Sequence, residues 1–129
     1  MDESSLKHYY DAREAARAIR RFASGRSYED YCTDEMLSSA IERKFEIIGE
    51  AFARIRRQRP DDLCLIGEWP AIIGFRNILA HAYEQIEDAV VWGIVTEQLP
   101  RFIEQLEAIP EIDSLSGQGS RVGRRPPEQ

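Results

Sequence analysis

The most constraining feature of the sequence is a seam of large apolar residues between Thr33 and Pro60. Its members recur at alternating steps of four and three residues: Ile41, Phe45, Ile48, Phe52 and Ile55. Such steps keep side chains on one face of an α-helix, whereas a strand would place every second residue on one face. The spacing therefore predicts a long amphipathic helix with one buried face. Thr33 or Asp34 can cap its start, and Pro60 ends it.

The same helical spacing recurs along most of the chain. A first helix is expected from about residue 4 until Gly25 stops it, and a short helical turn follows that Ser27 can cap. Pro70 fits the first turn of a third long helix, whose buried side we expect to be marked by Ile72, Phe75 and Leu79. A last helix begins near Asp88 and contains Pro100, which predicts a kink or a break there. Long helices with short connectors predict an all-α fold, an antiparallel four- to five-helix up-and-down bundle.

The composition changes at about Pro110, beyond which Gly, Ser, Pro and Arg dominate. We therefore expect one helical domain over residues 1–109 and a flexible tail over residues 110–129. A small bundle buries a modest core, and seam residues such as Tyr9, Tyr10 and Trp92 exceed what one bundle can cover, so we expect a homodimer.

The charge balance restricts the classes of partner. The chain has 129 residues and a formal net charge of −6, so it cannot clamp long duplex DNA by overall charge, and contact with nucleic acid would need a local basic patch. No apolar run approaches the roughly 20 residues that span a bilayer, and the first ten residues do not read as a signal peptide. The expected location is the cytoplasm, without a membrane partner. Cys32 and Cys64 are expected to be reduced, packed thiols.

The segment RNILAHAY places four polar side chains in an otherwise apolar helix: Arg76, Asn77, His81 and Tyr83. On a regular helix Arg76 and Tyr83 lie within about 20° of each other, and Asn77 and His81 share a face. Arg76 and His81, however, differ by about 140° in azimuth and about 7.5 Å along the axis. One helix cannot aim both at one atom. Either the turn at 80–83 departs from regular helix, or a second copy of the chain completes the site.

An arginine and a histidine without a carboxylate motif suit the cleavage of RNA. RNA carries its own nucleophile, the 2′-hydroxyl, and a histidine with a pKa near neutrality can accept or return its proton. An arginine such as Arg76 can hold the scissile phosphate, and Asn77 can orient His81 or contact the phosphate. This chemistry requires no metal and no cofactor. The chain also lacks a His-rich or Cys-rich cluster, a nucleophile elbow and a phosphate-binding glycine loop.

Each of these side chains also has a purely structural interpretation. Arg76 can form a solvated salt bridge with Glu84 or Glu87, which would contribute little to stability. His81 can cap the helix or lie in the core. Tyr83 can pack at an interface.

The pattern of Arg76, four residues, His81, one residue and Tyr83 resembles the Rx4HxY motif of HepT-like toxins. These are helical ribonucleases of the HEPN superfamily from prokaryotic toxin–antitoxin pairs. The resemblance covers roughly residues 5–109, and other segments carry it in the same order: FEIIGEA at 45–51, WPAIIGFRNILAHAY at 69–83 and VVWGIVTEQLPRFIEQL at 90–106.

The resemblance implies a toxin that acts as a metal-independent endoribonuclease. Arg76 and His81 would be its catalytic pair, with Asn77 as the polar neighbour, and two motifs would face a shared cleft in a homodimer. Tyr83 would be the hydroxyl to which the antitoxin, a minimal nucleotidyltransferase resembling MntA, transfers AMP from ATP. Glu50 would line the cleft.

Two other functions remain open at this stage. The bundle could be a non-enzymatic accessory or binding subunit of a minimal nucleotidyltransferase, in which case loss of His81 would change nothing. It could also be a decayed relative that keeps the fold without cleaving RNA. A stripe of arginines on the first helix, Arg13, Arg17 and Arg20, is expected to be a solvated face rather than an RNA-binding track.

Overall fold

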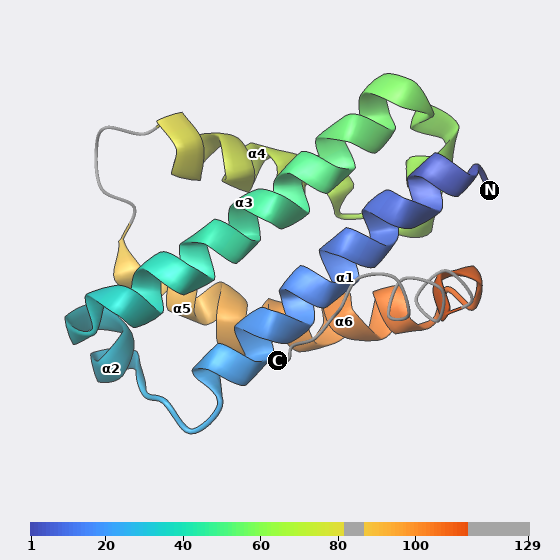
Figure 1. Cartoon of the computed structure of the whole chain (residues 1–129). Coiled ribbons are helices and arrows are strands. Elements are labelled where there is room, and N and C mark those ends of the chain that lie inside the picture. The colour runs from blue at the N-terminus through green and yellow to red at the C-terminus, as the bar shows by residue number, and fades with distance from the viewer. Residues whose placement is uncertain (82–86, 114–129) are drawn as a thin grey trace, which may run out of the picture.

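The chain folds as a bundle of helices, shown in Figure 1. The structure, a computed structural model, describes residues 1–81 and 87–113, and for residues 80 and 81 it describes the backbone alone. Its elements are α1 (Glu3–Ala23), α2 (Tyr28–Thr33), α3 (Glu35–Gln58), the 3₁₀-helix η1 (Pro60–Leu65), α4 (Trp69–His81), α5 (Asp88–Gly93), the π-helix η2 (Ile94–Gln98) and α6 (Leu99–Glu107). The described residues include no strand, which confirms the predicted all-α class.

The long segments alternate in direction, as Figure 1 shows. α1 runs antiparallel to α3, α4 runs back along α3, and the continuous stretch α5–η2–α6 returns beside α1. This is the predicted up-and-down arrangement. Within the described ranges, no helix is both long and apolar enough to cross a bilayer.

Local chemistry fixes the helix ends near the predicted positions. The Asp2 carboxylate accepts the N–H of Ser4 at 3.0 Å and caps α1, and Asp34 caps α3 in the same way. Gly25 follows α1 with a φ of 73°, a conformation that glycine adopts without steric penalty. Ser27 and Asp30 form a reciprocal capping box at α2.

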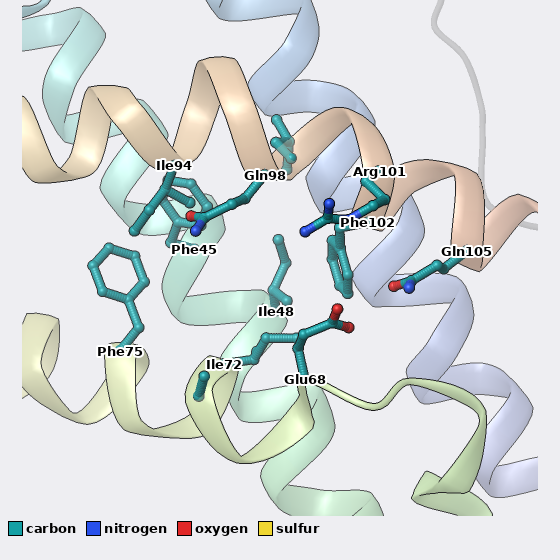
Figure 2. A pocket seen from close by; sticks show the side chains of 12 residues that line it. Phe45, Ile48, Glu68, Ile72, Phe75, Ile94, Gln98, Arg101, Phe102 and Gln105 are labelled. Carbon is teal, nitrogen blue, oxygen red and sulfur yellow. The ribbon is translucent and has the colours of Figure 1, made fainter.

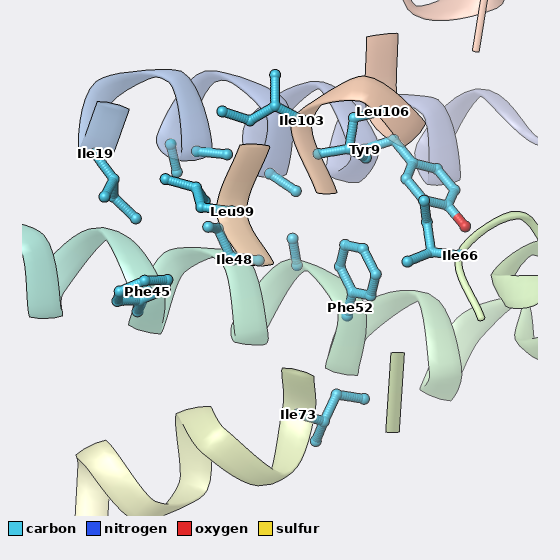
Figure 3. Close-up of a cluster of buried hydrophobic side chains, with 14 of the residues drawn as sticks. Tyr9, Ile19, Phe45, Ile48, Phe52, Ile66, Ile73, Leu99, Ile103 and Leu106 are labelled. Carbon is cyan, nitrogen blue, oxygen red and sulfur yellow. The ribbon is translucent and has the colours of Figure 1, made fainter. Parts of the chain in front are cut away.

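The core lies between α1, α3 and α6, as Figure 3 shows. All five residues of the predicted α3 seam are buried: Ile41, Phe45, Ile48, Phe52 and Ile55. They meet α1 through Tyr9 and Ile19 and through small alanines that let the two helices approach closely. Burial of each large apolar side chain contributes about 1.5–3 kcal/mol, so this seam is the main source of stability.

Pro100 interrupts the last helix as expected. Pro100 has no N–H to donate to the preceding turn, and the turn before it widens into the π-helix η2 before α6 begins. Along the whole stretch α5–η2–α6 the buried residues are those at positions 91, 95, 99, 103 and 106. Repeated steps of four would drift around a regular α-helix, so the wider turn keeps this stripe aimed at the core.

Two predictions about individual side chains are wrong. Arg13 is only 2% exposed, and its Nη1 donates to the Asp113 carboxylate at 2.9 Å, so it does not belong to a solvated stripe. Cys32 and Cys64 are exposed rather than packed, because each follows a buried residue on a short helix with one inward side. Ile112, the residue before Asp113, is fully buried.

Candidate active site

Arg76 lies where α4 crosses α3, and a glycine makes that crossing possible. A Cβ atom built on Gly49 would overlap the Cβ and Cγ atoms of Arg76 and would lie 3.4 Å from its Cα. Only a residue without a side chain leaves room for the arginine stem at this point. Ala53, one turn further along α3, is also small and is buried. The close approach of the two helices therefore fixes the base of the Arg76 side chain.

The guanidinium of Arg76 is not neutralised by a carboxylate in the described structure. Its Nη1 donates to the amide oxygen of Asn77 at 2.9 Å, and no ion pair to Arg76 is present among the described residues. Arg76 is half-buried and Asn77 is exposed. Of the two salt-bridge partners considered, Glu87 does not pair with it and Glu84 lies outside the described residues. A positioned and unpaired guanidinium is suited to binding a phosphate.

His81 is the last residue of α4. Because α4 stays helical from Arg76 to His81, the positions of these residues differ by about 140° and about 7.5 Å along the axis. The predicted departure from regular helix at residues 80–83 does not occur as far as His81, and residues 82 and 83 lie outside the described residues. Tyr83, the predicted modification site, lies outside the described residues.

Glu50, which was expected to line the site, forms an ion pair with Arg54 at 3.0 Å on the exposed side of α3. It sits one residue from Gly49 and is therefore turned by about 100° from the crossing with α4. The functional residue that sequence reasoning missed in the segment IIGEA is Gly49 itself.

An apolar cavity lies along α4, on the side that carries Ile72 and Phe75. It has a volume of about 190 Å³ and lies between α4, α3, η2 and α6. Figure 2 shows Phe75 and Phe45 at one end and the polar side chains of Glu68, Gln98 and Arg101 around it. The rings of Phe45 and Phe75 meet edge to face, with 5.2 Å between the ring centroids. The cavity exists because α4 packs on α3 and makes little contact with α6.

This packing changes which residues of α4 are buried. Ile73 is the residue buried against α3, whereas Ile72, Phe75 and Leu79, the predicted buried side, are half-buried. Ile78 is 51% exposed. α4 thus presents apolar side chains both to the core and away from it.

No group of three or more His, Cys, Asp or Glu side chains is arranged to hold a metal ion in the part of the chain whose side chains are described. Arg76 is a cationic hydrogen-bond donor and Asn77 is a neutral amide, so the pair suits an anion rather than a cation.

Comparison with known proteins points to one family. The sequence model of the family described as "Ribonuclease HepT-like" matches residues 12–109. This match spans α3, α4 and the stretch to α6, and therefore includes the crossing of Gly49 and Arg76.

Individual relatives agree with this match. The chain is 31% identical to "Putative RNase MJ1380" of Methanocaldococcus jannaschii over 110 residues, which are 84% of this chain and 100% of that protein. It is 30% identical to "Probable ribonuclease HepT" of Thermococcus cleftensis over 112 residues, 84% of this chain and 98% of that protein. No solved structure matches the chain.

Proposed function

The chain belongs to the HepT-like ribonuclease family, and from this premise we propose that it is a metal-independent endoribonuclease acting as the toxin of a toxin–antitoxin pair. Its substrate is RNA. Arg76 and His81 are the catalytic pair, and Asn77 orients one of them or contacts the phosphate. The antitoxin is a minimal nucleotidyltransferase that modifies Tyr83.

The proposal rests on Arg76, whose stem is fixed and whose guanidinium has no carboxylate partner among the described residues. Its stem is held by the close approach to Gly49, and among the described residues its guanidinium meets only the neutral amide of Asn77. An arginine kept for structure would normally meet a carboxylate, as Arg17 meets Glu107 at 2.8 Å. A fixed guanidinium with free donors can hold a scissile phosphate and stabilise the charge that develops on it.

The chemistry needs a proton acceptor for the 2′-hydroxyl of the ribose. In the proposed reaction His81 takes this proton, the 2′-oxygen attacks the adjacent phosphorus, and the bond to the 5′-oxygen of the next nucleotide breaks. A protonated histidine then returns the proton to the leaving oxygen. The products are a 2′,3′-cyclic phosphate and a free 5′-hydroxyl, and no metal takes part.

A homodimer would supply the geometry that one helix lacks. Two copies of α4 related by a twofold axis would set the Arg76 of one copy near the His81 of the other. The apolar surface of α4 supports this arrangement, because Ile78 is exposed and Phe75 is only half-buried beside an open cavity. A helix that is apolar on most sides normally has neighbours on most sides.

Transfer of AMP to Tyr83 would then silence the site. Positions 76 and 83 are seven apart, so on a continued helix they would share a face to within about 20°. An adenylate phosphate attached there would compete with the RNA phosphate for the Arg76 guanidinium. The variant Tyr83→Phe should remain toxic in the presence of the nucleotidyltransferase and should take up no AMP label. Normal labelling of this variant would refute Tyr83 as the acceptor.

The test of the nuclease is cleavage of defined RNAs by the purified protein in EDTA. Wild type should cleave, whereas Arg76→Ala and His81→Ala should each lose about 10²–10³-fold or more in rate. Circular dichroism and thermal unfolding should show that both variants keep the fold. If His81→Ala retained both cleavage and growth inhibition, the chain would be a binding subunit rather than this enzyme.

A further inference from the structure

The C-terminal turns of α3 carry an unusual concentration of positive charge. Four arginines fall within six residues there: Arg54, Arg56, Arg57 and Arg59, all of them exposed. Arg54 pairs with Glu50 at 3.0 Å. The other three, here called the arginine cluster, form no ion pair and no side-chain hydrogen bond within the described part of the chain. These three guanidiniums are therefore available to a ligand.

The stability of the helix does not account for the cluster. Cations in the last turn of a helix stabilise it by about 0.3–1 kcal/mol, but neighbouring like charges repel one another by similar amounts. Asp61 and Asp62 follow in η1 and form no ion pair with the cluster. In a protein with a net charge of −6, an uncompensated group of three arginines is a local exception that an anionic ligand would relieve.

Of the arginine cluster, Arg56 lies on the face of α3 against which Arg76 packs. Arg56 is seven residues beyond Gly49, so it lies within about 20° of the same azimuth and about 10.5 Å further along the axis. Ala53 lies between them on this face and is buried under α4. The first turns of α4 cover this face of α3, so a strand bound at Arg76 would pass beside α4 and reach Arg56 about two helical turns further along the α3 axis.

We infer that the arginine cluster binds the backbone phosphates of the RNA substrate next to the linkage held by Arg76. This inference rests on the proposed ribonuclease function and adds where the substrate runs. Arginine suits the task because its planar guanidinium binds phosphate through paired hydrogen bonds. A protein partner is a poorer fit, because interfaces are centred on apolar side chains and the only large apolar residue within 54–59, Ile55, is fully buried.

The chain offers a matched control at the opposite end of the bundle. Arg20 and Arg21 are also exposed neighbours in the last turn of a long helix, and neither forms an ion pair among the described residues. Because α1 runs antiparallel to α3, they lie far from the C-terminal end of α3. The pairs Arg56→Gln/Arg57→Gln and Arg20→Gln/Arg21→Gln remove the same charge from equivalent helix positions.

The binding experiment measures the anisotropy of a fluorescein-labelled single-stranded 20-mer RNA in EDTA, with all proteins carrying His81→Ala to prevent cleavage. The cluster variant, Arg56→Gln/Arg57→Gln, should bind the RNA about tenfold more weakly or worse. The slope of the logarithm of the association constant against the logarithm of the salt concentration should become shallower by about 1.4, since each of two lost phosphate contacts on a single strand contributes about 0.7. The control variant should bind within about twofold of the parent. Equal effects of both variants, no effect of either, or no binding by the parent would overturn the inference.

A cleavage experiment separates this inference from the proposed function. With His81 restored, the cluster variant should show a raised KM on the 20-mer and unchanged cleavage of a dinucleoside monophosphate, which is too short to reach the cluster. If wild type cleaves neither substrate, the nuclease proposal fails while the binding measurement still decides the RNA contact. If wild type cleaves both and the cluster variant matches it on both, the RNA does not contact the arginine cluster.

Discussion

The contact between Gly49 and Arg76 makes a prediction whose size follows from the structure. In Gly49→Ala the new methyl group would overlap the Cβ and Cγ atoms of Arg76, so α3 and α4 must separate or Arg76 must move. Overpacking of this kind costs about 1–3 kcal/mol. Alanine in place of a helical glycine stabilises the helix by about 1 kcal/mol. The expected net change is a loss of about 0–2 kcal/mol in the free energy of unfolding.

The matched control is Gly93→Ala, also within a helical stretch. A Cβ at Gly93 meets nothing within 4 Å, so this variant should gain about 1 kcal/mol from helix propensity alone. Urea unfolding followed by circular dichroism would measure both. The difference between the two variants isolates the overlap and should be about 1–3 kcal/mol.

Activity provides a second measurement on the same variants. Because the overlap falls on the stem of Arg76, Gly49→Ala should slow RNA cleavage more than its loss of stability explains, and Gly93→Ala should leave the rate unchanged. If Gly49→Ala were as stable as Gly93→Ala and fully active, the crossing would have room for a side chain and would not position Arg76.

Three further predictions address the dimer, the core and the response to pH. A mixture of Arg76→Ala and His81→Ala proteins, refolded together, should recover about a quarter of the wild-type rate, because half of the dimers are mixed and each holds one intact site; no recovery would mean that each site lies within one protomer. Arg13→Ala should lower the free energy of unfolding measured in urea by about 2–5 kcal/mol, because it truncates a side chain that is only 2% exposed and leaves a cavity. Asp113→Asn should cost less, because Asp113 is 73% exposed and the Arg13 guanidinium keeps its contact with the Glu14 carboxylate at 3.3 Å. Burial raises the pKa of Tyr9 from 10.0 to about 12, helped by Cys64 and Asp62, so the stabilisation is complete below pH 10 and is lost as the pH rises toward 12. In unfolding measured from pH 9 to 12, Tyr9→Phe should lose less stability than wild type.

Helical periodicity was sufficient to predict most of the fold. The seam from Ile41 to Ile55 is regular and has one apolar side, so its spacing alone identifies the buried face. The same reasoning failed on α4, where Ile73 is buried and Phe75 is only half-buried. A helix with apolar residues on most sides has no single face that a pattern could select, and packing against α3 made the choice.

Arg13 shows a different reason for failure. It lies about 40° from Tyr9 on the wheel of α1, at the edge of the apolar stripe, so its charge suggested a solvated position. In the structure it is buried and meets two carboxylates, that of the neighbouring Glu14 at 3.3 Å and that of Asp113, one hundred residues later, at 2.9 Å. A sequence pattern within one helix contains no information about such a distant partner.

The sequence was sufficient to nominate the residues of the candidate site, but not the helix packing that positions Arg76. Arg76, Asn77 and His81 stand out because polar side chains interrupt an apolar helix, and the structure adds that Arg76 and Asn77 are hydrogen-bonded to each other. Gly49 is 27 positions away and carries no chemistry, so nothing local marked it. Its role depends on the distance between two helices, which only the assembled bundle defines.

The two unusual properties of α4 have a common explanation under the proposed function. A monomer would gain nothing from the exposed Ile78, nor from an Arg76 that has no carboxylate partner among the described residues. A dimer that closes on α4 buries the apolar residues and, in the same step, brings each Arg76 to the His81 of the other copy. Association and assembly of the active site are then one event, because the surface that drives the first carries the residues of the second.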